Sequence, residues 1–209
     1  MIFLVLSDIH SQITHYFIEE LASKHNADAV ILLGDLTNFG PPEFILNLMV
    51  KDLPVLAIPG NCDPPAVLNY FEKAKMINMH KRVYNFSGIK IVGLGGADYS
   101  FINLGIGYTD EIAYDFLHTN LDEKSILILH QPPYGILDNV HGKHAGNKGI
   151  RKAVDEKRPY IVMSGHIHEE RGKLTIENSL FFNPGPAKDG YFAILKLDDD
   201  KINLDLLKR

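Results

Sequence analysis

Apolar runs of four or five residues recur in the first half of the chain, and amphipathic segments separate them. The runs have the length of buried strands, so we expect strands at residues 2–6, 29–33 and 54–58. Apolar residues at helical spacing predict helices at residues 14–24 and 43–50. Alternation of strand and helix is typical of a largely parallel sheet whose two faces are both buried.

The second half has a different pattern, with more strands and fewer helices. Helical spacing predicts helices at residues 110–118 and 148–157. Short apolar segments separated by turns predict strands at residues 83–86, 90–94, 125–129, 160–163, 173–177, 191–197 and 202–207. No linker, repeat or low-complexity stretch divides the chain. We therefore interpret residues 1–209 as one α/β domain in which two sheets pack together with helices outside.

Composition then narrows the class of protein. Apolar residues make up 45% of the chain and charged residues 22%, which is ordinary for a soluble globular protein. The net charge of −5 argues against a protein that coats nucleic acid, because such a protein needs a basic face. A single cysteine excludes an intramolecular disulfide and a zinc ribbon. No apolar run approaches the ~20 residues that span a bilayer, and the first strand lacks a basic leader, so we expect a cytoplasmic protein without membrane contact.

Polar clusters follow five of the expected strands, at the point where each strand ends. Ligands of open α/β sheets bind beyond the carboxyl ends of the strands, so we expect these clusters to meet at one place. Their Asp, Asn and His side chains offer oxygen and nitrogen donors, which suit Mn, Fe, Ni, Co or Zn better than Ca or Mg. The clusters are Ser7-Asp8-Ile9-His10, Gly34-Asp35, Gly60-Asn61-Cys62-Asp63, His130 and Gly165-His166-Ile167-His168.

The spacing within two clusters supports a metal site. Residues i and i+2 of an extended segment point the same way, so Asp8 and His10 can reach one ion. His166 and His168 can share one ion in the same way, or each can reach a different ion. One ion has roughly four to six coordination positions, fewer than the seven candidate ligands. Seven ligands suit two ions that share a bridging carboxylate. Glycines before the ligands permit the tight bends that expose them: Gly34, Gly60 and Gly165.

The order of these motifs resembles that of the calcineurin-like metallophosphoesterases. The resemblance runs from Asp8 to His168, and Asn183-Pro184-Gly185-Pro186 is similar to the closing segment of the small prokaryotic members. The stretch from His130 to Gly135, with His144 and Gly146, looks most like the branch related to cyclic-nucleotide phosphodiesterases. The resemblance implies a four-layer α-β-β-α sandwich, in which helices flank two mixed β-sheets.

The resemblance also implies a role for each motif residue. The first of two divalent transition-metal ions would be held by Asp8, His10 and His168, and the second by Asn61, His130 and His166. Asp35 would bridge the ions, which we expect to be Mn²⁺, with Fe, Ni, Co or Zn as alternatives. Catalytic roles fall to Asp35, Asn61 and His130, and a hydroxide that bridges the metals would attack phosphorus in line with the leaving group.

One motif departs from the family pattern, and the departure bears on the substrate. Many members carry a His at the position of Cys62, where it is thought to contact phosphate or protonate the leaving group. The protein-phosphatase branch orients that His with an Asp, and the corresponding position here is Asn38. A thiol is a weak hydrogen-bond donor and carries no positive charge. Its presence should therefore slow hydrolysis of a phosphomonoester dianion most. We therefore expect a phosphodiesterase that acts on a small or nucleotide-like diester.

Other positions have weaker interpretations. Asn61 and Cys62 are candidate substrate contacts, as are His141 and His144 around the Gly-rich loop of residues 142–149. Asp63 precedes Pro64-Pro65, which favours a role as the N-cap of the next helix. Surface positions are expected for the remaining histidines that no motif uses: His15, His25, His80 and His118.

Two alternatives to a phosphodiesterase remain open at this point. One is a phosphomonoesterase, and the other is a metal-binding scaffold of the same fold that works by protein contact. All seven ligand positions are filled, which favours an enzyme over a scaffold. The expected partner is a small-molecule phosphoester, nucleic acid is disfavoured, and neither the physiological substrate nor the oligomeric state follows from the sequence.

Overall fold

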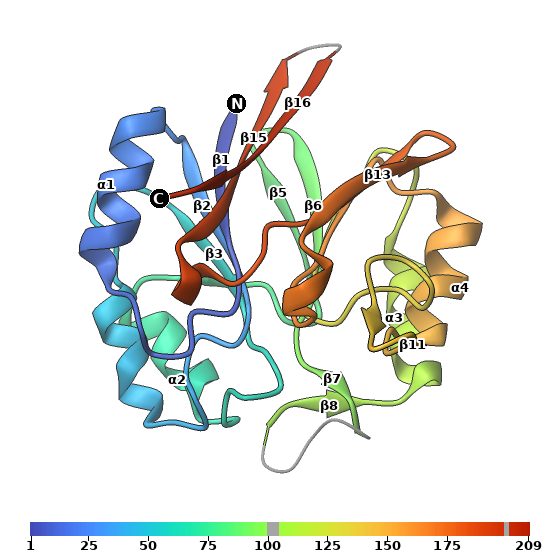
Figure 1. Cartoon of the computed structure of the whole chain (residues 1–209), viewed down its shortest axis with the longest axis horizontal. Coiled ribbons are helices and arrows are strands. Elements are labelled where there is room, and N and C mark those ends of the chain that lie inside the picture. The colour runs from blue at the N-terminus through green and yellow to red at the C-terminus, as the bar shows by residue number, and fades with distance from the viewer. Residues whose placement is uncertain (100–104, 199–200) are drawn as a thin grey trace.

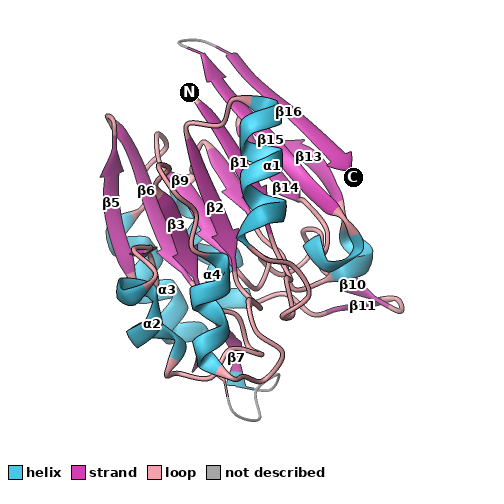
Figure 2. Cartoon of the chain, turned by 90° about the vertical axis from the view of Figure 1, so that its left-hand side faces the viewer, coloured by secondary structure: helices cyan, strands magenta, loops and turns pink. Residues whose placement is uncertain are grey.

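Two six-stranded sheets pack face to face, and helices cover their outer faces (Figures 1 and 2). The computed structural model of the protein describes residues 1–99, 105–198 and 201–209. The arrangement confirms the expected α-β-β-α sandwich with two mixed sheets. No helix among these residues is long and apolar enough to cross a bilayer.

The first sheet is built mainly from the amino-terminal half of the chain. Its strands lie in the order β16-β15-β1-β2-β3-β4. The strands β1 to β4 are parallel, whereas β15 runs antiparallel to both β1 and β16. The bounds are β1 (Ile2–Leu6), β2 (Ala29–Leu33), β3 (Val55–Ile58), β4 (Ile77–Asn78), β15 (Tyr191–Asp198) and β16 (Lys201–Lys208).

The second sheet has the order β13-β14-β12-β9-β6-β5. Its four inner strands are parallel, and an antiparallel strand closes each edge. The bounds are β5 (Arg82–Phe86), β6 (Ile89–Leu94), β9 (Ile126–Leu129), β12 (Ile161–Met163), β13 (Gly172–Ile176) and β14 (Ser179–Asn183). Two small ladders join β7 (Ala97–Asp98) to β8 (Gly107–Tyr108) and β10 (Asn139–Val140) to β11 (Lys143–His144).

Helices from the two halves of the chain cover opposite faces of the sandwich. The first sheet is covered by α1 (His15–His25), η1 (Pro42–Leu48) and α2 (Val67–Lys73), and the second by α3 (Asp110–Asn120) and α4 (Lys148–Lys157). Side-chain caps start the last two helices, where Thr109 accepts from the Ile112 N–H and Asn147 accepts from the Ile150 N–H. Single 3₁₀ turns occur at η3 (His168–Glu170) and η4 (Ala187–Asp189).

Side chains of the central strands point alternately to the two faces of their sheet, and this divides the core into layers. In β1, Phe3 and Val5 face the second sheet, whereas Leu4 and Leu6 pack with the helices that cover the first sheet. Because side chains of a strand point to opposite faces in turn, a wholly apolar run is what a strand between two apolar layers requires. The continuous apolar runs in the sequence reflect this double burial.

Several expectations differ from the structure. The helix expected at 43–50 is a 3₁₀ helix at Pro42–Leu48, a short element whose first position lacks a side-chain cap. The strand β14 was not predicted, since Ser179 and Asn183 bracket only three apolar residues. The Gly-rich loop at 142–149 contains β11 and the first turn of α4. The helix after Asp63 starts only at Val67, so Asp63 is not its cap and that prediction is wrong.

Candidate metal centre

The five polar clusters meet at the carboxyl ends of strands from both sheets. The loops after β1, β2 and β3 bring residues from the first sheet, and those after β9 and β12 bring residues from the second. The ordered packing of the two sheets therefore places segments that are far apart in the sequence at one edge of the sandwich. The residues that gather there are Asp8, His10, Asp35, Asn61, His130, His166 and His168.

Asp8, His10 and His168 form the first group. The Nε2 atom of His168 lies 3.3 Å from Asp8 Oδ1 and 3.4 Å from His10 Nε2. The three potential ligand atoms lie within 4.8 Å of one another, so one cation could contact all three. Asp8 is buried and His168 is half-buried, so this group opens to solvent on the His168 side.

Asp35 connects the first group to a second one. Its Oδ2 lies 3.7 Å from His10 Nε2, and its Oδ1 lies 3.4 Å from His130 Nε2. His130 Nε2 is also 2.9 Å from Asn61 Oδ1, and His166 contributes a potential ligand atom within 4.8 Å of those of Asp35 and His130. One carboxylate thus presents an oxygen to each group, which is the arrangement that a bridging ligand needs.

The donor set fits divalent cations. His130 Nδ1 lies 2.8 Å from the Leu33 carbonyl, to which its N–H donates, so Nε2 faces the Asp35 and Asn61 oxygens. Either a proton on Nε2 or a bound cation can lie between the imidazole nitrogen and these two oxygens. Asp8 Oδ1 is buried and receives no hydrogen bond from the described residues, although His168 is near. A buried carboxylate oxygen without a donor is the group that a metal would satisfy.

Burial and charge set the protonation of the metal-free site. Burial lowers the pKa of His130, but the Asp35 carboxylate outweighs this effect and raises that pKa to about 9. Burial also lowers the pKa of His166, to about 4. Burial would raise the pKa of Asp35, yet His130 and the Cys62 N–H together hold it below its usual range. At neutral pH His130 therefore carries a proton that a bound cation would replace.

Comparison with known proteins identifies the family of this chain. The family model of the metallophosphoesterases of the calcineurin superfamily matches residues 41–207. The chain belongs to this family. Membership confirms the predicted family, and it makes the protein a metal-dependent hydrolase of phosphoesters.

Similar proteins include one sequence relative and two solved structures. The sequence is 32% identical over 195 residues to the uncharacterized protein MJ1162 of Methanocaldococcus jannaschii, covering 88% of this chain and 86% of that protein. The fold is similar to that of TT1561 of Thermus thermophilus, with a TM-score of 0.75, 19% identity and coverage of 98% and 97%. A novel archaeal phosphodiesterase has a TM-score of 0.55, 16% identity and coverage of 99% and 100%. The two structural likenesses show the shared fold.

Backbone conformation is unusual at four of the candidate ligands of this metallophosphoesterase. Asp8, His10, Asp35 and His166 have φ values of 55°, 48°, 49° and 67°, in the left-handed region that costs non-glycine residues energy. Sequence analysis did not detect this feature, although Asp and His are among the residues that tolerate it best. All four of these candidate ligands lie in loops that follow strands, outside regular secondary structure.

Three glycines that the sequence places before ligands act in two different ways. Gly34 has a φ of 93°, and a Cβ there would lie 2.7 Å from His130 Nδ1. Gly60 has no positive φ, but a Cβ would collide with the Asp35 carboxylate and backbone. At Gly165 a Cβ would overlap Ser7 and Asp8. Gly60 and Gly165 are therefore needed for close approach rather than for a bend.

Asp63 binds two loops together instead of capping a helix. Its carboxylate is fully buried and accepts hydrogen bonds from the backbone N–H groups of Leu36, Thr37 and Gly60, and from the Thr37 hydroxyl. These donors belong to the loops that follow β2 and β3 and carry Asp35 and Asn61. Asp63 therefore fixes the relative position of two ligand loops.

Cys62 lies beside the metallophosphoesterase centre as a neutral thiol. Its backbone N–H donates to Asp35 Oδ1 at 2.7 Å, and the side chain is 9% exposed. Burial, and then the nearby Asp35 carboxylate, raise the pKa of the thiol far above its usual value. A thiol that holds its proton so firmly is a poor nucleophile and supplies no positive charge to a phosphate. Its Sγ also lies close enough to Asp35 and His10 to contact a cation.

The two histidines expected to touch substrate lie on the β10–β11 hairpin. His144 is exposed, and its Nδ1 lies 2.7 Å from Asp138 Oδ1. His141 is exposed in the turn, with a φ of 50°, and no contact joins it to the ligands within the described residues. Asp138 was missed in the sequence analysis because a carboxylate in a loop gives no signal until its histidine partner is known.

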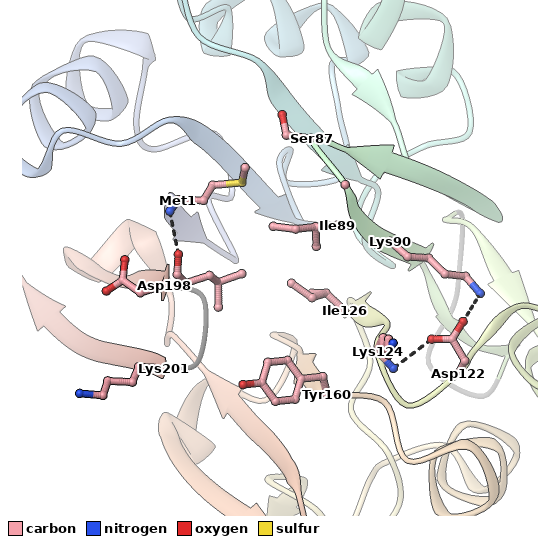
Figure 3. Close-up of a pocket in the computed structure, with 12 residues that line it drawn as sticks. Met1, Ser87, Ile89, Lys90, Asp122, Lys124, Ile126, Tyr160, Asp198 and Lys201 are labelled. Carbon is pink, nitrogen blue, oxygen red and sulfur yellow. Dashed lines mark hydrogen bonds and ion pairs between the residues drawn. The ribbon is translucent and has the colours of Figure 1, made fainter.

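A large cavity lies away from the candidate ligands. A cavity of about 640 Å³ lies at the opposite, amino-terminal edge of the strands, where residues of both sheets line it (Figure 3). It contains no predicted ligand. Lys90 forms an ion pair with Asp122 at its wall, with Nζ and Oδ2 2.6 Å apart. The chemistry of the side chains, rather than volume, locates the metallophosphoesterase centre.

Proposed function

We propose that this metallophosphoesterase is a phosphodiesterase that hydrolyses a small or nucleotide-like phosphodiester and uses two divalent transition-metal ions, with Mn²⁺ favoured. The observation that carries the proposal is Asp35, whose two carboxylate oxygens face two separate groups of donors. Families of this chemistry use paired ions about 3.5–4 Å apart to clamp the attacking and leaving oxygens. The archaeal phosphodiesterase with the same fold is consistent with the proposal.

The proposed ligand sets follow the two groups around Asp35. Asp8, His10 and His168 would hold one ion, and Asn61, His130 and His166 the other. When bound, the ions would supply positive charge to the phosphate and acidify a water molecule. The chain's own residues orient this chemistry, since the hydrogen bond to Leu33 fixes the His130 ring. Asn61 offers a neutral amide oxygen and adds no negative charge that would repel phosphate.

The preference for diesters rests on the side chain at position 62. A phosphomonoester carries two negative charges near neutral pH, whereas a diester carries one. The raised pKa of Cys62 leaves a neutral group where a cationic donor would assist a dianion. The absence of that cationic donor should therefore lower the rate of monoester hydrolysis more than the rate of diester hydrolysis.

The proposal is tested by comparing bis(4-nitrophenyl) phosphate with 4-nitrophenyl phosphate in the presence of Mn²⁺. We expect a higher kcat/KM for the diester and a loss of turnover in Asp35→Asn, which removes the bridging charge. Faster hydrolysis of the monoester would contradict the preference and support a phosphomonoesterase. Mn²⁺ binding without turnover of either ester would instead support a scaffold that works by protein contact.

A further inference from the structure

A buried aspartate, Asp138, holds the exposed histidine His144 of β11. Asp138 is 1% exposed, and its Oδ2 accepts from the N–H groups of Gly135 and Gly146 at 2.8 and 2.9 Å. Its Oδ1 lies 2.7 Å from His144 Nδ1. An ionised carboxylate can only accept, so His144 Nδ1 carries the hydrogen of this contact, and Nε2 lies on the far side of the ring. The arrangement is that of an oriented acid or base.

This Asp138–His144 pair adjoins the segment that carries His130. His144 lines a cavity of about 390 Å³ together with Gln131, the residue that follows His130. The Gln131 amide is fully buried and donates to the Ala145 carbonyl, which joins the two segments directly. On the other side, β10 packs against η3, which begins at His168. Figure 1 places β11 toward the end of the molecule at which β1 terminates.

The reaction under the proposed function needs a proton donor for the leaving group. Cys62 stands at the position where many family members carry a histidine for this role. Hydrolysis forms a bond from a water oxygen to phosphorus and breaks the bond from phosphorus to the leaving oxygen, which takes the electron pair. An alkoxide is a poor leaving group unless it receives a proton as the bond breaks. Cys62 is buried, with its Sγ near the candidate ligands Asp35 and His10, whereas His144 is exposed to an incoming substrate.

We propose that His144 donates this proton from Nε2 to the leaving oxygen, and that Asp138 is its positioning residue. The inference rests on the proposed phosphodiesterase function. The leaving oxygen departs as a neutral alcohol, and the proton that the attacking water releases restores the doubly protonated imidazole. Atoms and charges balance over one turnover without a further reactant. The Asp138 carboxylate holds the His144 ring in place through its contact with Nδ1.

The surroundings of His144 include charged groups from several elements. The Tyr134 ring lies 5.1 Å from the His144 ring, and the Lys148 ammonium lies 5.4 Å from the Tyr134 ring. Asp98 of β7 and Asp110 of α3 line the same cavity. A leaving alcohol with an aromatic or sugar portion could pack on Tyr134 while its oxygen meets His144. The site thus suits a nucleotide-like diester better than a simple dialkyl phosphate.

Two diesters with different leaving groups test the role of His144. Nitrophenolate leaves without a proton, whereas the sugar hydroxyl of a ribonucleoside 2′,3′-cyclic phosphate needs one. With Mn²⁺ present, we expect His144→Gln to lower kcat for the cyclic phosphate roughly 100-fold or more. We expect kcat for bis(4-nitrophenyl) phosphate to change by less than about threefold. Added imidazole should partly restore kcat for the cyclic phosphate in His144→Ala, which a merely structural role would not allow.

Controls separate this inference from the proposed function. Lys143→Gln changes an exposed neighbour on β11 and should leave both rates unchanged. Asp138→Asn should lower the cyclic phosphate rate without affecting Mn²⁺ binding. Equal losses for both diesters in His144→Gln, no loss for either, or a wild-type protein that cleaves only the aryl diester would each overturn the role of His144. If the wild-type protein cleaved neither diester, the proposed function itself would fail, and the inference with it.

Discussion

At the scale of single residues, the candidate ligands combine an unusual backbone conformation with close packing. Asp8, His10 and Asp35 have positive φ values, and each such residue costs on the order of 1–3 kcal/mol. Backbone hydrogen bonds oppose this cost, since the Asp8 N–H donates to the Gly34 carbonyl and the His10 N–H to the Asp35 carbonyl. The sequence predicts the residue types at these positions, but local propensities cannot predict a conformation that tertiary hydrogen bonds impose.

Gly60 provides a test of this close packing. Gly60→Ala would place a methyl group against Asp35, so we expect a loss of roughly 1–3 kcal/mol in the free energy of unfolding. Displacement of Asp35 should weaken Mn²⁺ binding as well. Urea denaturation and calorimetric titration measure the two effects. The matched variant Gly172→Ala meets nothing closer than Leu137 at 3.5 Å and should change neither quantity, so similar behaviour of the two variants would refute the argument.

His80 predicts a pH dependence that is separate from the metal centre. It was expected at the surface, but it is partly buried and its Nδ1 accepts from the Gly95 N–H at 3.2 Å. Burial, and then Lys81, lower its pKa from 6.5 to about 4. Between these values the unfolded chain binds the proton and the folded chain does not, so stability falls as the pH drops from 6.5 to 4. The full decrease in the free energy of unfolding is roughly 3 kcal/mol.

The measurement compares the wild-type protein with His80→Gln, whose amide oxygen can still accept the Gly95 hydrogen. Urea unfolding at pH 7 and pH 5 should show that the variant loses less stability on acidification than the wild type does. His118→Gln alters an exposed histidine on α3 and serves as the control. The same pH dependence in all three proteins would rule out His80 as the source.

At the scale of elements, continuous apolar runs predicted central strands such as β1, β2 and β3 because these strands are buried on both faces. β1 and β2 begin and end where the sequence indicates, and α4 does as well. The strand β14 escaped prediction because its short apolar stretch gains its partners only from β12 and β13. Side chains that act across loops, such as Asp63 and Asp138, were missed or misassigned because their donors lie on other segments.

Asp63 links the loops after β2 and β3, and its removal should loosen both. Asp63→Asn replaces an acceptor oxygen with an amide that faces N–H donors, so we expect a loss of roughly 3 kcal/mol in the free energy of unfolding. The exposed Asp155 pairs with Arg151 on α4, and Asp155→Asn should cost less than about 1 kcal/mol. Urea denaturation measures both losses, and equal values would contradict the role assigned to Asp63.

At the scale of the whole molecule, the candidate ligands come from both sheets. Asp35 and Asn61 follow strands of the first sheet, whereas His130 and His166 follow strands of the second. A metal that binds them all connects the two sheets at one edge of the sandwich. Metal binding should therefore stabilise the fold as a whole and not only the loops.

Thermal unfolding in the presence of Mn²⁺ tests this linkage. At a free Mn²⁺ concentration about 100 times Kd, binding adds roughly 3 kcal/mol to the free energy of unfolding. This raises the Tm of a chain of this size by about 5–10 °C. A chelator should return the Tm to its starting value. Asp35→Asn should lose most of the increase, since it weakens both groups of donors at once. An equal increase in the variant would show that Mn²⁺ binds elsewhere.

The pairing of β1 with β15 has a consequence for the order in which the protein is synthesised. The ligands are complete once residue 168 has been made, but β1 keeps one edge unpaired until Tyr191–Asp198 follows. An unpaired edge of apolar residues invites pairing with other chains. On the ribosome, the nascent chain therefore acquires every candidate metal ligand before it gains the hairpin that covers the edge of β1. A product cut short after residue 190 would keep that edge open and tend to aggregate, even with all seven ligands present.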